Sequence, residues 1–325
     1  MKVWTCRSYG GPDVLLEEEI TKPTPSLNEI LIKIYATTVS SGDWRVRSMT
    51  LPRGFGMIGR LVFGIYGPRQ PILGTECSGV VEAVGSGVSP IEFQVGDEVV
   101  AFTGGKMGCH AQYLNVNKMS PVIKKPQRLD FETAAAMSFG GSTALHYLNL
   151  ANVVAGEHVL VLGASGAVGT AIIQLAVHKG AIVTGVCSGK NVEMVRSLGT
   201  STVIDYTETD FRTLTGDDDP KYDVVVDTLG KSSIAECHLL LKENGRFAAI
   251  AGDLSTMFTR PIGTKRVLAG PSAETKESLA KLAELVEIGA FKPVVGEQFS
   301  WDNMKNAHAL VDSGHKVGSV VVRVC

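Results

Sequence analysis

The most informative segment of this chain reads Val159-Leu-Val-Leu-Gly163-Ala-Ser-Gly166-Ala-Val-Gly169, and a helical pattern follows it over residues 170–179. A short apolar run of this kind is typical of a buried strand, and the small residues after it let the backbone wrap closely around an anion. Gly166 leaves room for phosphate groups, and Gly169 lets the helix pack against the strand. The segment therefore predicts a strand, turn and helix that bind a dinucleotide.

The literal G-x-G-x-x-G fingerprint is incomplete, because Ala164 stands where its first glycine is expected. A second apolar strand over 181–187 follows at the distance that a right-handed crossover needs, so 163–187 is predicted to be one βαβ unit. The alternative, a small-residue turn without a ligand, stays open. The predicted cofactor contacts in this turn are Ala164, Ser165, Gly166, Ala167, Val168 and Gly169.

The end of the second strand, Cys187-Ser-Gly-Lys190-Asn191, indicates which dinucleotide is bound. An NAD site usually places an Asp or Glu there, and this carboxylate would repel the 2′-phosphate of NADP. Ser188, Lys190 and Asn191 instead offer hydrogen-bond donors and one positive charge, which favours NADPH. In the alternative interpretation Lys190 simply begins the next helix in solvent.

The rest of the chain divides into two kinds of pattern. Four more apolar strands, at 202–205, 222–227, 245–251 and 265–270, bring the count to the six of a doubly wound parallel α/β sheet. Residues 1–125 carry short alternating strands such as 29–34 and 79–84, and this β pattern resumes after a helix over 273–289 with a strand at 318–323. We expect a β-rich domain over 1–125 and 273–325, interrupted by a cofactor-binding domain over 126–272. The acidic run 215–220 is expected to be a solvated loop.

Composition limits the function classes. A chain of 325 residues favours two domains, and its net charge of −2 gives no footprint for nucleic acid or for an anionic membrane. We find neither an apolar run of signal-peptide length at the start nor about 18 uncharged apolar residues in a row, so a cytoplasmic location is expected. The six cysteines form no C-x-x-C pair and are interpreted as reduced thiols.

Several motifs along the chain resemble those of one enzyme family. They are Gly10-Gly11-Pro-Asp-Val-Leu, Asp43-Trp-Arg-Val-Arg, Leu73-Gly-Thr-Glu76-Cys-Ser-Gly, Val95-Gly-Asp-Glu-Val, Gly141-Ser-Thr-Ala, Val203-Ile-Asp-Tyr206 and Gly314-His-Lys-Val-Gly. Together with the turn, they resemble the medium-chain dehydrogenase/reductase superfamily and, within it, the zinc-free quinone oxidoreductase (zeta-crystallin-like) branch. The resemblance implies a GroES-like β-rich catalytic domain, a Rossmann cofactor-binding domain and a homodimer.

The resemblance also implies which metal positions to inspect. Zinc-dependent relatives hold ligands at the places that correspond here to Ser40, Thr75 and Phe139 or a neighbour of Phe139. None of these is a good zinc ligand, so we expect a metal-free site. Without a Lewis acid, nothing lowers the pKa of an alcohol, so we expect little alcohol oxidation at neutral pH. NADPH can instead deliver hydride to a quinone or to an α,β-unsaturated carbonyl compound.

Several site residues follow from the same resemblance. Ser40 stands where relatives often carry an Asn near the nicotinamide, and Thr143 resembles a threonine that contacts the cofactor near that end. Asp43 is either catalytic or a buried carboxylate that bonds local backbone. Tyr206 resembles a tyrosine at the 2′-phosphate, although it could equally pack at a strand end. Ala251 and Gly252, after the fifth strand, complete the predicted cofactor contacts.

The segment 51–68 is glycine-rich and apolar, and we expect it to be irregular. It is interpreted either as a substrate lid or as a cover of the β-rich domain, and Tyr66 within it is the candidate for a substrate-facing hydroxyl. Lys106 and Lys316 are expected to be solvated.

Two other functions stay open on this sequence. One is a metal-free alcohol or aldehyde reductase that uses a proton relay. The other is an NADPH-binding protein with a non-catalytic role. A panel of acceptors separates them from the quinone or enone reductase that we expect.

Overall fold

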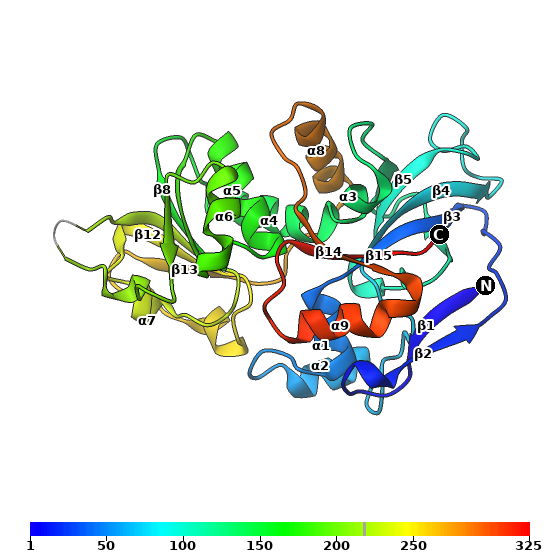
Figure 1. Cartoon of the computed structure of the whole chain (residues 1–325), viewed down its shortest axis with the longest axis horizontal. Helices are drawn as coiled ribbons and strands as arrows, with labels where there is room; N and C mark the ends of the chain where they lie inside the picture. The colour runs from blue at the N-terminus through cyan, green and yellow to red at the C-terminus, as the bar shows by residue number, and fades with distance from the viewer. Residues whose placement is uncertain (217–218) are drawn as a thin grey trace.

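A computed structural model describes residues 1–216 and 219–325 of the chain. It has two lobes, which lie at the two ends of the long axis, and both marked chain ends lie in the same lobe (Figure 1). Residues 217 and 218 belong to the acidic run 215–220, so the prediction of a solvated loop there lies outside the described residues.

The cofactor lobe is built on a parallel sheet of six strands. They are β8 (His158–Leu162), β9 (Ile182–Cys187), β10 (Thr202–Asp205), β11 (Tyr222–Asp227), β12 (Leu241–Ala249) and β13 (Arg266–Ala269). Their order in the sheet is β10-β9-β8-β11-β12-β13, and every neighbouring pair is parallel. The strand order reverses between β8 and β11, which is where doubly wound sheets open a crevice for a ligand. The predicted doubly wound α/β sheet is confirmed.

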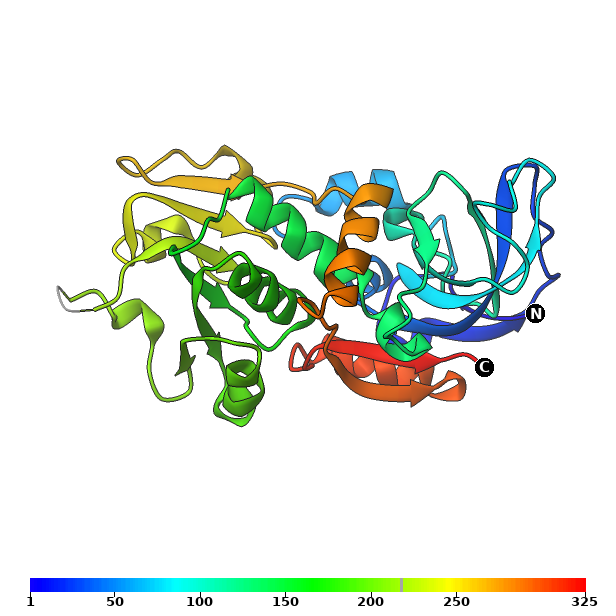
Figure 2. The same cartoon turned by 90° about the horizontal axis from the view of Figure 1, so that it is seen from above.

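Helices cover the sheet and connect it to the other lobe. They are α4 (Ser138–Leu150), α5 (Ala167–His178), α6 (Val192–Ser197), α7 (Ile234–Cys237) and α8 (Lys276–Glu287). Leu279 and Leu282 of α8 share one apolar core with Val159 of β8 and Ile172 of α5. Figure 2 shows α8, in orange, standing between the two lobes, where it contacts both α4 and β7. The domain boundaries at 125–126 and 272–273 stay a prediction.

The β-rich lobe joins strands from both halves of the chain. Its strands are β1 (Lys2–Cys6), β2 (Leu15–Glu19), β3 (Glu29–Val39), β4 (Glu76–Val84), β5 (Glu98–Phe102), β6 (Tyr113–Asn117), β7 (Val122–Lys124), β14 (Val295–Ser300) and β15 (Ser319–Arg323). The large sheet runs β14-β15-β3-β4-β5-β7, with β6 also paired to β3. Helices α3 (Phe131–Ala135) and α9 (Met304–Asp312) lie against it, and α1 (Ser41–Ser48) packs on α9. The GroES-like β-rich lobe is therefore present as expected.

The segment 51–68 is not irregular throughout, so that prediction was wrong. Residues 56–63 form a further helix, α2 (Gly56–Phe63; Figure 1). Gly59 is buried, and a Cβ there would lie 2.0 Å from Leu51 Cδ1, so the glycine lets the helix lie close to its own approach segment. Phe63 packs on the core of the β-rich lobe. Tertiary packing thus outweighs the poor helix propensity of two glycines.

No helix among residues 1–216 and 219–325 is both long enough and apolar enough to cross a bilayer.

Candidate active site

The turn after β8 explains the incomplete glycine pattern. Gly163 takes the left-handed conformation, with φ +78°, so the tight bend falls one residue before the place where the fingerprint expects it. Ala164 is buried, and its N–H donates to the carbonyl of Val186 at 3.0 Å. A Cβ on Gly169 would lie 2.2 Å from the Gly163 carbonyl oxygen, which confirms that close helix–strand packing requires glycine there.

The first turn of α5 has the properties of a phosphate site. Gly166 is its N-cap residue, and the first hydrogen bond back into the turn is from Thr170 N–H to Gly166 O. The amides of Val168 and Gly169 make no hydrogen bond to any residue that the structure describes, whereas the Ala167 amide faces the Gly318 carbonyl in a parallel β-bridge between Gly166 and Gly318. A Cβ on Gly166 would meet only the Gly163 oxygen, at 3.5 Å. Free amides at a positive helix end, with open space before them, fit a pyrophosphate.

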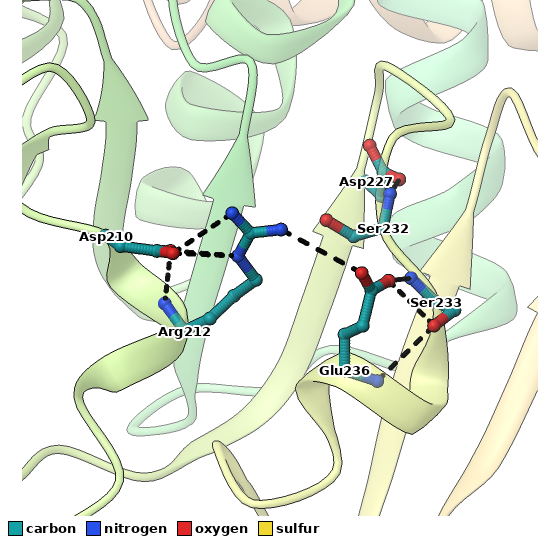
Figure 3. Close-up of polar contacts among 6 residues, drawn as sticks. All are labelled: Asp210, Arg212, Asp227, Ser232, Ser233 and Glu236. Carbon is teal, nitrogen blue, oxygen red and sulfur yellow. Dashed lines mark hydrogen bonds and ion pairs between the residues drawn. The ribbon is translucent and has the colours of Figure 1, made fainter.

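The loop after β11 lies over this turn and is organised by Asp227. Its carboxylate accepts hydrogen bonds from the amides of Leu229 (2.8 Å), Gly230 (3.0 Å) and Ser232 (2.9 Å; Figure 3). Burial raises the pKa of Asp227, and these amide donors act in the opposite direction. Thr228 fixes the loop to β8 through a 2.8 Å hydrogen bond to the Leu162 carbonyl. Sequence reasoning missed Asp227, although an acid that ends an apolar strand is a visible signal.

Just beyond this loop, a short helix is held by charged side chains. Ser233 and Glu236 form a capping box at α7, and Arg212 reaches both Asp210 and Glu236 (Figure 3). These contacts are exposed and support the far end of the loop without entering the crevice.

The loop after β12 supplies another wall of the crevice. Ile250 N–H donates to the Asp227 carbonyl at 3.0 Å, and a Cβ on Gly230 would lie 2.3 Å from the Ala251 oxygen. Ala251 and the adjacent Gly252 therefore stand beside the β11 loop at the carboxyl edge of the sheet. This is the edge at which the phosphate turn lies.

The four residues chosen for the 2′-phosphate also come together. Ser188, Lys190 and Asn191 follow β9, Tyr206 follows β10, and Tyr206 N–H donates to the Cys187 carbonyl at 3.0 Å. Asn191 Nδ2 donates to Ser188 Oγ at 3.2 Å. Lys190 is exposed, and the Tyr206 side chain is 52% exposed, so both can meet a ligand from solvent.

One carboxylate at this end escaped sequence reasoning. Asp205 lies against Gly189, where a Cβ would be 2.4 Å from Asp205 Oδ2. The backbone N–H and hydroxyl of Thr207 bond its Oδ1 and lower its pKa, so the group is charged at neutral pH. An open hollow of about 600 Å³ adjoins it, between α6 and β10. The linear sequence hides Asp205 because it belongs to the neighbouring strand.

The three positions that hold zinc ligands in related enzymes converge around Gly42. A Cβ on Gly42 would lie 3.3 Å from Ser40 Oγ, 3.5 Å from the Phe139 ring and 3.8 Å from the Thr75 methyl group. Thr75 Oγ1 donates to Ser40 Oγ at 3.4 Å. The place thus carries two hydroxyls and a phenyl ring, which is not a zinc donor set.

Asp43 is fully buried beneath this cluster. Its Oδ2 accepts from the Ser40 amide (2.7 Å) and hydroxyl (2.6 Å), and its Oδ1 accepts from the Gly74 amide (2.7 Å). The Asp43 amide donates in return to Ser40 Oγ, which completes a capping box at α1. These contacts favour the backbone-bonding alternative for Asp43 and show how Ser40 is held in place.

A second buried carboxylate, Glu76, joins the lobes. Its Oε2 accepts from the amides of Ser138 (2.9 Å) and Phe139 (2.7 Å) at the start of α4, and its Oε1 accepts from Thr38 Oγ1 (2.7 Å). Burial raises its pKa to about 7, against the effect of these donors. Glu76 therefore fixes the helix that carries Thr143.

The prediction for Lys316 was wrong. This lysine is partly buried and not solvated as expected; burial lowers its pKa to about 8, while the charge of Glu76 acts to raise it. Its Nζ donates to the Gly318 carbonyl, and the Gly318 amide donates to the Ser165 carbonyl at 2.8 Å. The β-rich lobe thus contacts the phosphate turn directly. Lys106, in contrast, is exposed as expected.

Thr143 and Tyr66 have different surroundings. Thr143 is buried on α4, and its hydroxyl donates to the Phe139 carbonyl at 2.8 Å, one turn earlier. Tyr66 is 90% exposed, so its ring is not enclosed with Ser40, Thr75 and Thr143 in this conformation. Its role as a substrate-facing hydroxyl stays a prediction.

Comparisons with known proteins agree with this architecture. The alcohol dehydrogenase GroES-like domain model matches residues 26–127, and the zinc-binding dehydrogenase model matches residues 198–322. An NADPH-dependent alkenal/one oxidoreductase of Arabidopsis thaliana is 32% identical over 99% of this chain and 79% of its own length. The quinone oxidoreductase of Homo sapiens is 30% identical over 94% of this chain and 92% of its own.

A solved structure gives the same result. The quinone oxidoreductase from Coxiella burnetii superimposes with a TM-score of 0.85 at 27% identity, over 100% of this chain and 99% of that one. The chain therefore belongs to the medium-chain dehydrogenase/reductase superfamily, as a quinone oxidoreductase-like member.

Proposed function

We propose that this protein is a zinc-independent, NADPH-dependent oxidoreductase that reduces quinones or α,β-unsaturated carbonyl compounds. The observation that carries the proposal is the meeting of Ser40, Thr75 and Phe139 at the place of the zinc ligands in related enzymes. Two hydroxyls can hydrogen-bond an acceptor oxygen but cannot replace a Lewis acid. The names of the relatives, an alkenal/one oxidoreductase and two quinone oxidoreductases, support the same acceptor classes.

The crevice offers a partner for each part of the cofactor. The amides of Val168 and Gly169 would hold the pyrophosphate, Ala251 and Gly252 would line its path, and Thr143 would stand near the nicotinamide end. Ser188, Lys190 and Tyr206 would take the 2′-phosphate. When bound, NADPH supplies the hydride. Asp205 adds a negative charge at the 2′ end, and the Thr207 hydrogen bonds keep it ionised, so an NADPH preference depends on the positive charge of Lys190.

The hydroxyl pair can stabilise charge on the acceptor oxygen. The hydrogen bond from Thr75 Oγ1 to Ser40 Oγ is weak, because its length of 3.4 Å is near the outer limit of a hydrogen bond. The Thr75 hydroxyl is therefore able to turn to a substrate carbonyl. Ser40 donates to Asp43 at 2.6 Å and therefore keeps its own orientation. We infer that Thr75 donates to the developing enolate or hydroquinone oxygen, while Ser40 and Asp43 act as positioning residues.

A panel assay tests the function. Purified protein should oxidise NADPH with quinones and with enones, and should fail with saturated aldehydes. Turnover of saturated aldehydes would favour the alcohol or aldehyde reductase. NADPH binding without turnover of any acceptor would favour the non-catalytic role. Stoichiometric zinc in purified, active protein would overturn the zinc-independent proposal.

We further propose a cytoplasmic homodimer whose partners are small molecules and not nucleic acid. Strand β13 supports a dimer, because it lies at the edge of its sheet and is only partly buried, so a second copy can pair along it. Sedimentation velocity measures the oligomeric state, and a monomer at all concentrations would refute the dimer.

A further inference from the structure

Helix α2 and the residues after it expose an unusual amount of apolar surface. Met57 is 79% exposed, and the neighbouring apolar side chains are all exposed by close to half or more. We refer to them together as the apolar face of α2: Met57, Ile58, Leu61, Val62, Ile65 and Tyr66. Exposed apolar patches of this kind on a folded protein usually mark an interaction site.

The direction of these side chains follows from helical geometry. At about 100° per residue, Met57, Ile58, Leu61 and Val62 fall within one arc, and Gly59 and Phe63 fall on the opposite side. Gly59 and Phe63 are the residues that face the protein, against Leu51 and the core of the β-rich lobe. The helix is therefore apolar on nearly all sides, with Arg60 as its one polar side chain, and its wider apolar arc faces outward.

The segment is held in this orientation by contacts at both ends. Tyr9 Oη donates to the Gly64 carbonyl at 2.6 Å, and Arg69 N–H donates to the Phe63 carbonyl at 2.6 Å. At the other end, the Leu254 amide donates to the Arg53 carbonyl at 2.9 Å. The apolar face is thus presented by a formed and anchored helix.

Charge identifies the partner. Residues 51–69 contain Arg53, Arg60 and Arg69 and no Asp or Glu, although the whole chain has a net charge of −2. All three arginines are exposed, and none forms an ion pair with a residue that the structure describes. Exposed apolar side chains flanked by unpaired cations match the boundary between acyl chains and anionic headgroups.

We propose that the apolar face of α2 docks on an anionic lipid surface. Met57, Ile58, Leu61 and Val62 enter the acyl boundary, and the three arginines meet lipid phosphates. A substrate lid would direct these side chains towards the protein, and a second copy would have to offer an acidic complement. Our earlier expectation of no anionic membrane rested on the net charge of the whole chain, which averages out this local basic segment.

Vesicle co-sedimentation of the full-length protein tests the proposal. We expect binding to phosphatidylcholine vesicles that contain phosphatidylglycerol, at least roughly tenfold weaker binding to phosphatidylcholine alone, and weakening by salt. The double variant Met57→Ser/Leu61→Ser should lose roughly tenfold or more in vesicle partitioning. Arg53→Gln/Arg60→Gln should lose the preference for anionic lipid.

Matched controls are available elsewhere on the surface. Ile91, which is 92% exposed in the β-rich lobe, and Arg128, also exposed, give Ile91→Ser and Arg128→Gln, and neither should change vesicle binding. Wild-type protein that stays in the supernatant with anionic vesicles overturns the proposal. The proposal is also overturned if the protein is an oligomer and Met57→Ser/Leu61→Ser dissociates it, because the apolar face of α2 would then join copies of the chain. Binding is measured without turnover, so failure here leaves the proposed reaction untouched.

Discussion

Alanine at Gly169 should damage both the stability of the protein and its affinity for NADPH. The new Cβ would lie 2.2 Å from the Gly163 oxygen and 2.9 Å from Ala164 Cα, whereas ordinary contact begins at 3.4 Å. Both neighbours are backbone, so α5 must move away by roughly 1 Å. Overpacking of this kind costs about 1–3 kcal/mol. The same movement lengthens the phosphate contacts of the α5 amides, and a loss of about 1.4 kcal/mol there is a tenfold loss of affinity.

Alanine at Gly166 is the matched control. Its φ of −79° and ψ of 170° suit any residue, and the nearest atom to the new Cβ is the Gly163 oxygen at 3.5 Å. The methyl group therefore costs the folded protein little, but it occupies the space in front of the free amides. We expect Gly166→Ala to unfold within about 0.5 kcal/mol of wild type and to lose roughly tenfold in NADPH affinity.

Thermal unfolding with and without NADPH separates the two effects. Without cofactor, only Gly169→Ala should show a lower Tm, by about 2–4 °C per kcal/mol for a domain of this size. With cofactor, wild type should gain stability in proportion to ligand concentration over Kd, and both variants should gain less. The reasoning is refuted if Gly169→Ala has the Tm of wild type without NADPH, or if Gly166→Ala lowers that Tm as much as Gly169→Ala does. Either result would show that the space around the two glycines does not differ as described.

Three further predictions concern cofactor choice, the reaction and pH. Lys190→Ala should weaken NADPH binding roughly tenfold and leave NADH binding unchanged in fluorescence titrations. The control Lys281→Ala should alter the binding of neither cofactor. If Lys190→Ala loses equal affinity for both cofactors, Lys190 does not bind the 2′-phosphate. Thr75→Val should lower kcat roughly 10- to 100-fold with little change in the KM for NADPH. Thr5→Val, at another buried threonine, should leave kcat unchanged. An unchanged kcat for Thr75→Val would show that Thr75 takes no part in the reaction. Burial holds the pKa of His308 well below 6.5, and His110 and Arg47 act in the same direction. The unfolded chain therefore binds a proton that the folded chain does not, and stability is lost as the pH falls below about 6.5, by up to about 1.4 kcal/mol per pH unit. Buried carboxyl groups with raised pKa act in the opposite direction. The measurement is therefore the difference between wild type and His308→Asn in urea unfolding at pH 7.5 and 5.5. If the free energy of unfolding changes equally with pH in both proteins, the imidazole does not contribute.

The cofactor lobe was predictable because its signals are local. Each buried parallel strand is a short apolar run, and Gly163, Gly166 and Gly169 act within a few residues of one another. The predicted strand at 202–205 matches β10, and the predicted strand at 222–227 matches β11. The order of strands in the sheet then follows from the right-handed crossovers of such folds.

The parts that the sequence did not reveal depend on distant partners. The pKa of Glu76 is raised by burial in the folded protein, against the effect of donors from β3 and α4, and the pKa of Lys316 is lowered by burial. Asp205 reaches the end of β9 only through strand pairing. Helix α2 has two glycines and no side-chain cap, so its existence depends on packing of Phe63 and Gly59 and not on propensity.

The hydrogen bond from the Gly318 amide to the Ser165 carbonyl has a consequence for biosynthesis. Ser165 emerges from the ribosome long before Gly318, so a nascent chain whose Rossmann sheet has already formed still lacks one wall of the phosphate turn. Strand β15, which begins at the next residue, must first pair with β3, which lies far earlier in the chain. We therefore expect tight capture of cofactor only after β15 has been made and has paired with β3.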